Sequence, residues 1–402
     1  MSQASGINTQ TSDKLVVLQA GESIGSNNGV RTVELGIASG LANEGITTRF
    51  LGPKCTSTEE LVGRGVFLPA KLRGWKQRGY YGTPIIMPEL NAIVDKELEE
   101  VGLLVVQSIS VLSARTMFAK RRMTTPLGAI FHGHTMDDRY IRKWFPIVGP
   151  VASSVVSWAM KHYILNHVDE IIVPSDLLAR MYMRRFKLKR KPTVWAAPVV
   201  IPRDLPEETE LAFDDRFTLI YVGRIGKEKN IETLLTLFSR LYYIMPRARL
   251  VLIGGGEVAR HQAIARKLPF RAGEGVEFLG NQSFDRIQAI NRKAALSGNA
   301  IGISCSRTET QGVALLEQLA AGLPVTVYDG TVWTEDLEKS RTGLLLSGRS
   351  IEEDACSLKE LARDTNQRLR MAEFGPALIQ QNHNPITQYK KLAKIYRRVA
   401  ES

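Results

Sequence analysis

One stretch of the chain, residues 304–324, dictates a loop followed by a helix. It continues an apolar run, Ala300–Ile303, that is typical of a buried parallel strand. Apolar residues recur at helical spacing after Gly312, and Gly322, with Pro324 two residues beyond, ends the predicted helix. In a parallel sheet the loop after a strand lies at the carboxyl edge, where α/β proteins bind ligands. We therefore expect a ligand site within this stretch.

Two carboxylates stand eight residues apart in this stretch, Glu309 in the predicted loop and Glu317 in the predicted helix. Eight helical residues span about 12 Å, which approximates the distance from the ribose of a bound nucleotide to a sugar on its diphosphate. Between them, the backbone N–H groups of Gln311, Gly312 and Val313 should lie unpaired at the helix N-terminus, where they can bind phosphate or sugar oxygens. The stretch therefore predicts a site for phosphate or sugar oxygens.

The spacing and flanks of this stretch resemble the Glu-x7-Glu signature of retaining glycosyltransferases with the GT-B fold, the family 4-like group. The matching residues are Glu309, Gly312, Glu317, Gly322, Pro324 and Val325. The resemblance implies an α/β chain of two doubly wound Rossmann-like domains that face each other across a cleft. It further implies a UDP- or GDP-sugar donor. Glu309 and the amides after it would bind the sugar hydroxyls, and Glu317 would accept hydrogen bonds from the ribose hydroxyls.

A second motif follows the predicted strand 217–222, where a turn carries Arg224 and Lys229 before a helix with Asn230 as its predicted N-cap. This turn matches the Gly-Arg-x4-Lys pattern of the same family. A diphosphate leaving group gains negative charge as the glycosidic bond breaks, and fixed cations aimed at it lower the barrier. Arg can hold two oxygens at once, whereas Lys acts as a point charge. With two cations in this role, we expect neither a metal nor a cofactor.

The remaining strands and turns complete the predicted domains. Further strands are expected at 250–253, 276–279 and 325–327. Gly280 follows one of them, at the place where relatives seat the nucleotide base. The four prolines of 192–206 predict the interdomain linker. The expected division is a disordered segment 1–13, an acceptor-binding domain 14–205, a nucleotide-sugar-binding domain 206–384 and a helix 385–402 that, as in relatives, crosses back onto the first domain.

The first half opens with a predicted strand 14–18, a glycine-containing loop and a helix 29–43. The loop does not fit the dinucleotide pattern G-x-G-x-x-G. It resembles instead the Asn-Gly-Val loop of a lipid-glycosylating branch, similar to sulfoquinovosyl- and mannosyltransferases, in which Gly29 would let the backbone approach the donor phosphates. Strands are also expected at 92–94, 103–106 and 128–132.

Two histidines, His132 and His134, follow the predicted strand 128–132. An i, i+2 pair without further ligands is a poor zinc arrangement. The loop resembles the His-Thr loop of the same branch, which would make His134 a catalytic contact to the donor sugar. His132 is the rival for that role.

Charge distinguishes the two halves of the chain, whose net charge is +12. Residues 1–206 hold 26 Lys and Arg against 17 Asp and Glu, so the first half is expected to meet an anionic partner. Cations interleaved with aromatic residues at 71–82 and a basic run at 180–191 suit an anionic bilayer surface, or less readily a nucleic acid. The acceptor or membrane candidates are Lys71, Arg73, Trp75, Lys76, Arg78, Arg184, Arg185 and Lys187.

Residues 1–13 lack the apolar segment of a secretory signal, and the weakly polar run 146–160 is too short to span a bilayer. Three widely separated cysteines indicate reduced thiols. We therefore expect a cytoplasmic protein, free or peripheral on the membrane face.

The predicted function is retaining transfer of a sugar from a UDP- or GDP-sugar to an acceptor, with a membrane lipid as one candidate. The alternatives are transfer to a soluble polysaccharide, protein or nucleic acid, and hydrolysis or epimerisation of the nucleotide-sugar on the same fold. A nucleic-acid binder without catalysis would explain the basic first half but would have no use for Glu309 and Glu317.

Overall fold

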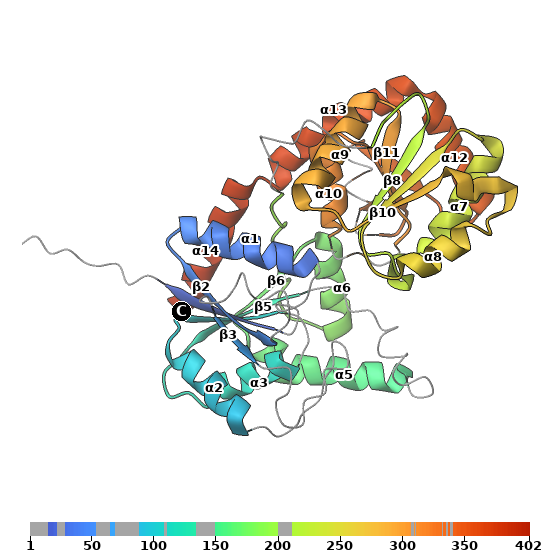
Figure 1. Cartoon of the computed structure of the whole chain (residues 1–402). Coiled ribbons are helices and arrows are strands. Elements are labelled where there is room, and N and C mark those ends of the chain that lie inside the picture. The colour runs from blue at the N-terminus through green and yellow to red at the C-terminus, as the bar shows by residue number, and fades with distance from the viewer. Residues whose placement is uncertain are drawn as a thin grey trace, which may run out of the picture.

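The computed structural model describes residues 15–21, 29–53, 65–68, 88–107, 111–133, 149–199, 211–306, 309, 311–331, 333–334, 337 and 341–402. These residues form two parallel sheets, each with helices on both faces (Figure 1). The doubly wound α/β architecture expected from the sequence is therefore confirmed for both halves.

The first sheet has the strand order β3-β2-β1-β4-β5-β6-β7, with parallel registers between all neighbours. Its strands are β1 (Val16–Ala20), β2 (Thr47–Pro53), β3 (Gly65–Leu68), β4 (Leu103–Gln107), β5 (Gly128–His132), β6 (Glu170–Val173) and β7 (Thr193–Val194). One face packs against α2 (Pro88–Glu99), α3 (Val111–Lys120), α5 (Gly149–Tyr163) and α6 (Asp176–Phe186). The opposite face packs against α1 (Gly29–Asn43) and α14 (Pro385–Ala400).

The second sheet repeats this plan with the order β10-β9-β8-β11-β12-β13. Its strands are β8 (Thr218–Val222), β9 (Arg249–Ile253), β10 (Val276–Gly280), β11 (Ala300–Ser304), β12 (Val325–Tyr328) and β13 (Gly343–Leu346). Helices α7 (Ile231–Ile244), α8 (Val258–Ala265) and α12 (Ile351–Arg363) cover one face, and α9 (Phe284–Ser297), α10 (Val313–Ala320) and α13 (Thr365–Asn382) cover the other. The apolar strands are buried on both sides, as a parallel sheet requires.

The last helix, α14, crosses back to the first sheet, as predicted (Figure 1). Leu392 and Tyr396 are fully buried there. Trp195, just after β7, donates its indole N–H to the carbonyl of Gln388 at 2.9 Å. Tyr389 packs onto α1 at Gly40, where a Cβ would come within 2.3 Å of the Tyr389 ring. A small residue in α1 therefore sets how closely the two helices approach.

Two expectations about the first half need correction. Residues 92–94 were expected to form a strand but lie inside α2. Val94 and Leu98 recur four residues apart and are both buried, so the helical period governs this segment rather than the short apolar run. The predicted linker 192–206 also begins too early, because Thr193 and Val194 form β7 beside β6.

The α1–α14 contact makes a testable prediction. Gly40→Leu should lower the free energy of unfolding by about 1–3 kcal/mol, because the new side chain must displace the Tyr389 ring from a packed contact. Urea unfolding measures the change. Ala42→Leu is the matched control, since Ala42 is exposed on the same helix and should accept the same side chain with little loss. Equal stability of the two variants would contradict the packing described here.

Candidate active site

The site lies where the strand order of the second sheet changes direction. From β8 the chain winds outward to β9 and β10, then returns to place β11 on the other side of β8. The turn after β8 and the loop after β11 consequently meet at one carboxyl edge. In open α/β sheets this switch point is the usual position of a ligand site.

At this edge, the Nζ atom of Lys229 lies 2.7 Å from Oε1 of Glu309. The lysine side chain is 28% exposed and the glutamate side chain 13% exposed, so solvent screens the pair only in part. Two residues predicted separately, from motifs 80 residues apart, are thus brought into direct contact. Their roles toward a donor stay predictions, but their proximity is a property of the fold.

Asn230 ties the two loops together through its side chain. It is the N-cap of α7, as predicted, in a left-handed conformation, but its side chain makes no hydrogen bond to the backbone of the first helical turn. Instead, Nδ2 donates to the carbonyl of Cys305 at 3.1 Å, and Oδ1 accepts from Thr233 at 2.7 Å. These bonds lock the turn after β8 to the end of β11. The local sequence around Asn230 gives no signal of this connecting role.

The guanidinium of Arg224 is half exposed at the same turn, with Nε 3.7 Å from Oε1 of Glu228. Its backbone is fixed more firmly, because the buried Tyr221 hydroxyl donates to the Arg224 carbonyl at 2.8 Å. Burial raises the pKa of Tyr221 well above its usual value, so the phenol keeps the proton that it donates. Arg224 thus has a fixed backbone and a side chain able to turn toward an incoming anion.

Glycines let the neighbouring turns pack closely. Gly254, after β9, has a φ of +141°, and a Cβ there would come within 1.9 Å of the Gly223 carbonyl oxygen. The Gly254 amide donates to the carbonyl of Gly280 at 2.8 Å, which links the ends of β9 and β10. Gly280 itself has open space where a side chain would lie. This leaves room beside the position predicted to seat the nucleotide base.

Helix α10 begins as predicted, with Gly312 as its N-cap in a left-handed conformation. A Cβ at Gly312 would come within 2.7 Å of Nε1 of Trp333, so the glycine is required both by its φ angle and by the indole that packs against it. The amides of Gln311 and Val313 flank this turn. The local geometry suits close approach of a ligand to backbone N–H groups.

Glu317 is partly buried on α10, on the side that faces α9. Burial raises the pKa of its carboxyl to about 7, and the Gln288 side chain from α9 opposes that rise. Glu317 is therefore not a fully solvated helix residue. A carboxyl that loses hydration on burial gains most from hydroxyl partners.

His132 and His134 have different outcomes. His132 is buried at the end of β5, with its Nε2 3.1 Å from the Tyr396 hydroxyl and its ring against Trp195 and Tyr396. It belongs to the packing of α14 on the first sheet. His134 lies outside the described residues. Gly29 is the first residue of α1, as expected.

Of the acceptor and membrane candidates, Lys71, Arg73, Trp75, Lys76 and Arg78 lie outside the described residues. Arg184 and Lys187 are exposed at the end of α6. Arg185 is different, because its guanidinium holds the Ser157 hydroxyl of α5 with Nε and Nη2 at 3.1 and 2.9 Å. Arg185 thus joins two helices, while Arg184 and Lys187 face solvent.

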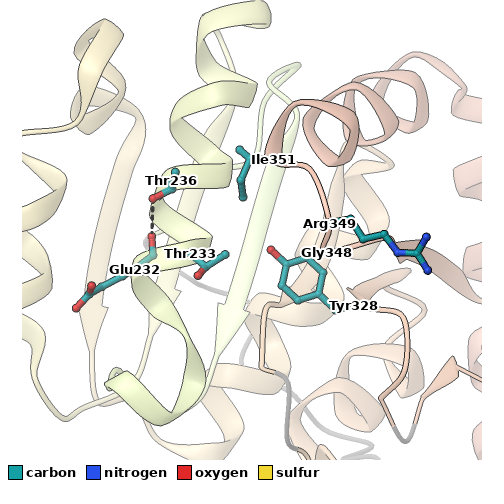
Figure 2. Close-up of a pocket in the computed structure, with 7 residues that line it drawn as sticks. All are labelled: Glu232, Thr233, Thr236, Tyr328, Gly348, Arg349 and Ile351. Carbon is teal, nitrogen blue, oxygen red and sulfur yellow. Dashed lines mark hydrogen bonds between the residues drawn. The ribbon is translucent and has the colours of Figure 1, made fainter.

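A cavity of about 440 Å³ lies beside the site, between α7, the ends of β12 and β13, and the start of α12 (Figure 2). Tyr328 points toward α7, whereas the charged ends of Glu232 and Arg349 point away from the cavity. Its seven lining residues include none of the predicted donor contacts. It shares only Thr233 with the network around Asn230.

Within the described part of the chain, no group of three or more His, Cys, Asp or Glu side chains is placed to hold a metal ion. The same residues contain no helix with the length and apolar character needed to cross a bilayer.

Both halves match known family models. Residues 27–201 match the model "Glycosyltransferase Family 4", and residues 204–377 match "Glycosyl transferases group 1". A two-domain α/β chain with doubly wound sheets and a returning C-terminal helix has the GT-B fold. The chain belongs to the family 4-like glycosyltransferases, as its Glu-x7-Glu stretch had indicated.

Among curated proteins, the chain is similar to a GDP-mannose-dependent alpha-(1-6)-phosphatidylinositol monomannoside mannosyltransferase of Mycobacterium tuberculosis, with 28% identity over 40% of this chain and 42% of the relative. It is also similar to sulfoquinovosyl transferase SQD2 of Arabidopsis thaliana, with 26% identity over 62% of this chain and 47% of the relative. The alignments thus span less than half the length of either relative.

Solved structures confirm the fold across the chain. Sucrose-phosphate synthase from Thermosynechococcus elongatus superposes with a TM-score of 0.72 at 16% identity, covering 96% of this chain and 100% of that one. Anabaena HepE in complex with UDP and glucose gives a TM-score of 0.70 at 14% identity, covering 94% and 98%. At these identities the likeness establishes architecture alone.

The raised pKa of Glu317 makes stability depend on pH. The folded chain holds this proton up to about pH 7, whereas an unfolded glutamate releases it near the ordinary pKa of 4.5. Ionisation of Glu317 therefore lowers stability as pH rises through that window. Glu317→Gln should remove this loss and stabilise the chain at pH 8 by up to about 3 kcal/mol, at about 1.4 kcal/mol per pKa unit. At pH 5 the gain should be small.

Urea unfolding at both pH values measures this difference. Glu360→Gln is the matched control, because Glu360 is exposed on α12. A gain for Glu317→Gln that is the same at pH 5 and pH 8 would contradict the assignment.

Proposed function

We propose that the chain is a retaining glycosyltransferase that moves a sugar from a nucleotide-sugar to an acceptor hydroxyl. The observation that carries the proposal is the contact between Lys229 and Glu309 at the switch point of the second sheet. Lys229 and Arg224 neutralise the donor diphosphate, Glu309 and the amides of the Gly312 turn hold the sugar, and Glu317 accepts from the ribose hydroxyls.

The chemistry proposed is a front-face substitution. The acceptor oxygen bonds to the anomeric carbon on the face from which the diphosphate leaves, and the bond from that carbon to the phosphate oxygen breaks. The electron pair stays on the nucleoside diphosphate, and the acceptor proton passes to the departing phosphate oxygen. Fixed cations are most useful at this oxygen, because its negative charge grows toward the transition state.

The free chain suggests how the charges are balanced before the donor arrives. Glu309 neutralises Lys229 through the 2.7 Å contact, so the cation is not left unpaired in a partly buried position. A diphosphate brings more negative charge than one carboxylate and can take over Lys229. Glu309 is then free to accept hydrogen bonds from the sugar hydroxyls.

Relatives support a donor of this class. The Mycobacterium tuberculosis relative is named as GDP-mannose-dependent, and the structural neighbour HepE was solved with UDP and glucose. They suggest UDP- and GDP-sugars as the first donors to test. Hydrolysis or epimerisation of the donor is the less favoured activity, since the named relatives are transferases.

We propose a lipid at an anionic membrane surface as the acceptor. The Acholeplasma laidlawii relative, 28% identical over 33% of this chain, is named alpha-monoglucosyldiacylglycerol synthase, and the Mycobacterium relative is named for a phosphatidylinositol mannoside. In this chain, Trp158 and Tyr163 of α5 are 54% and 48% exposed, and their rings meet edge to face. Exposed aromatic residues next to cations suit the interfacial region of a bilayer.

Contacts between α5 and α6 join this aromatic pair to the basic segment. Arg185 of α6 holds Ser157, the residue before Trp158, and Met181 of α6 is 46% exposed. The exposed cation Arg184 follows on the same helix. We propose that the α5–α6 surface, defined by Trp158, Tyr163, Met181 and Arg184, rests on anionic lipid and places the acceptor near the donor domain.

The catalytic role of Lys229 can be tested directly. Lys229→Ala should lower kcat/KM for the nucleotide-sugar at least about 100-fold, the scale for losing one contact to developing charge. Lys227→Ala is the control, because Lys227 is exposed in the same short turn and should retain nearly full activity. Activity is followed by release of nucleoside diphosphate with a lipid acceptor and with water alone. Near-normal turnover of Lys229→Ala would remove this role, and release without an acceptor would favour hydrolysis.

The membrane contact makes a separate prediction. The double variant Trp158→Ala/Tyr163→Ala should float with vesicles of anionic phospholipid at least about 10-fold less than the parent chain, since it loses the apolar anchors. Tyr243→Ala/Phe270→Ala is the control, because these half-exposed rings, tilted against each other, lie on the second domain. Equal flotation of both double variants would overturn the assignment of the surface to α5 and α6.

A further inference from the structure

Two buried N–H donors flank the Gly312 turn and have no hydrogen-bond partner among the described residues. They are Nε1 of Trp333 and Nε2 of Gln311. Trp333 is only 3% exposed, and its Nε1 has almost no contact with solvent, so water does not satisfy it either. An indole N–H can only donate, which leaves it no alternative within the protein.

The position of Trp333 is fixed by packing. Its ring lies in the apolar cluster that contains Leu315 and Leu319 of α10 and Leu337. The edge of the ring that carries Nε1 lies against Gly312, where a Cβ would come within 2.7 Å of that atom. The orphaned N–H is therefore at the N-terminus of α10, beside the amides proposed to hold the donor sugar.

Most buried polar groups in folded proteins are hydrogen-bonded, and an orphaned donor destabilises the chain that holds it. Trp195, which packs against α14, shows the ordinary arrangement. Its Nε1 donates to the Gln388 carbonyl at 2.9 Å. A helix N-terminus that is flanked by two additional unpaired donors has the chemistry to receive an oxygen-rich ligand. Hydroxyl groups of a sugar provide such acceptors.

We propose that the Trp333 indole N–H is a specificity-determining contact to the transferred sugar. This inference rests on the proposed function and adds a residue from the segment after β12 to the loops after β8 and β11. Nε1 is sealed from solvent in the free chain, so the Gly312 turn, rather than the packed indole, must shift for the sugar to reach it. The bond forms with the sugar and not with the diphosphate.

Trp333→Phe tests the proposal, since it keeps an aromatic ring and removes the N–H. Binding is measured by calorimetry for UDP-glucose and UDP, and for GDP-mannose and GDP. For the nucleotide-sugar that the parent chain binds, affinity should fall at least about 5-fold, while affinity for the matching diphosphate should stay within about 2-fold. The thermal midpoint of the free variant should be unchanged or higher, because an unsatisfied donor has been removed.

Trp195→Phe is the matched control, because it removes a satisfied N–H. It should lower the thermal midpoint and leave the ratio of nucleotide-sugar to diphosphate affinity unchanged. Equal affinities of Trp333→Phe and the parent chain for the nucleotide-sugar would overturn the proposal, as would an equal loss for diphosphate and nucleotide-sugar. If the parent chain binds none of the four ligands, the proposed function fails first, which is a different result from a Trp333→Phe variant that binds like the parent.

Discussion

The pairing of β8 with β11 is the constraint on which the rest of the site depends. It brings the ends of two strands to one edge, although the residues they position lie 80 apart in the chain. The contact between Lys229 and Glu309 follows directly, and Asn230 reinforces it by bonding the Cys305 carbonyl. The close packing of Gly223 and Gly254 extends the same edge toward Gly280. A site for a long ligand is thus built from short turns on rigid strands.

Much of this arrangement could be predicted from the sequence, because it depends on local signals. The strand, loop and helix around Gly312 have clear periodicity and stop signals, and the separate Arg224–Lys229 turn has the same form at β8. Once both are assigned to the carboxyl edges of parallel strands, general rules of topology bring them together. The two carboxylates also differ as their positions suggest, since Glu309 is in a loop and Glu317 is within a packed helix.

Other features could not be predicted, because they depend on contacts between distant segments. Nothing in the local sequence distinguishes His132 as a packing residue until Tyr396 is placed against it. The orphaned N–H of Trp333 is equally invisible, since its environment comes from α10. The short apolar run 92–94 gave the wrong element because three residues carry too little periodicity to separate strand from helix. Asn230 is the N-cap of α7 as predicted, but the bond from its side chain to the Cys305 carbonyl, just after β11, could not be foreseen.

The return of α14 to the first sheet has a consequence for how the chain acquires its structure. The strands of that sheet are complete by Val194, yet part of their cover is supplied by residues 385–400, and Lys391 reaches back to the Val194 carbonyl. During synthesis, part of one face of the first sheet therefore stays uncovered, with its apolar side chains exposed to solvent, until the whole second domain has been made. Among the described residues, α13 is the last element that packs on the second sheet. The second domain can therefore fold as soon as α13 emerges. The half that is made first is thus the half that finishes last.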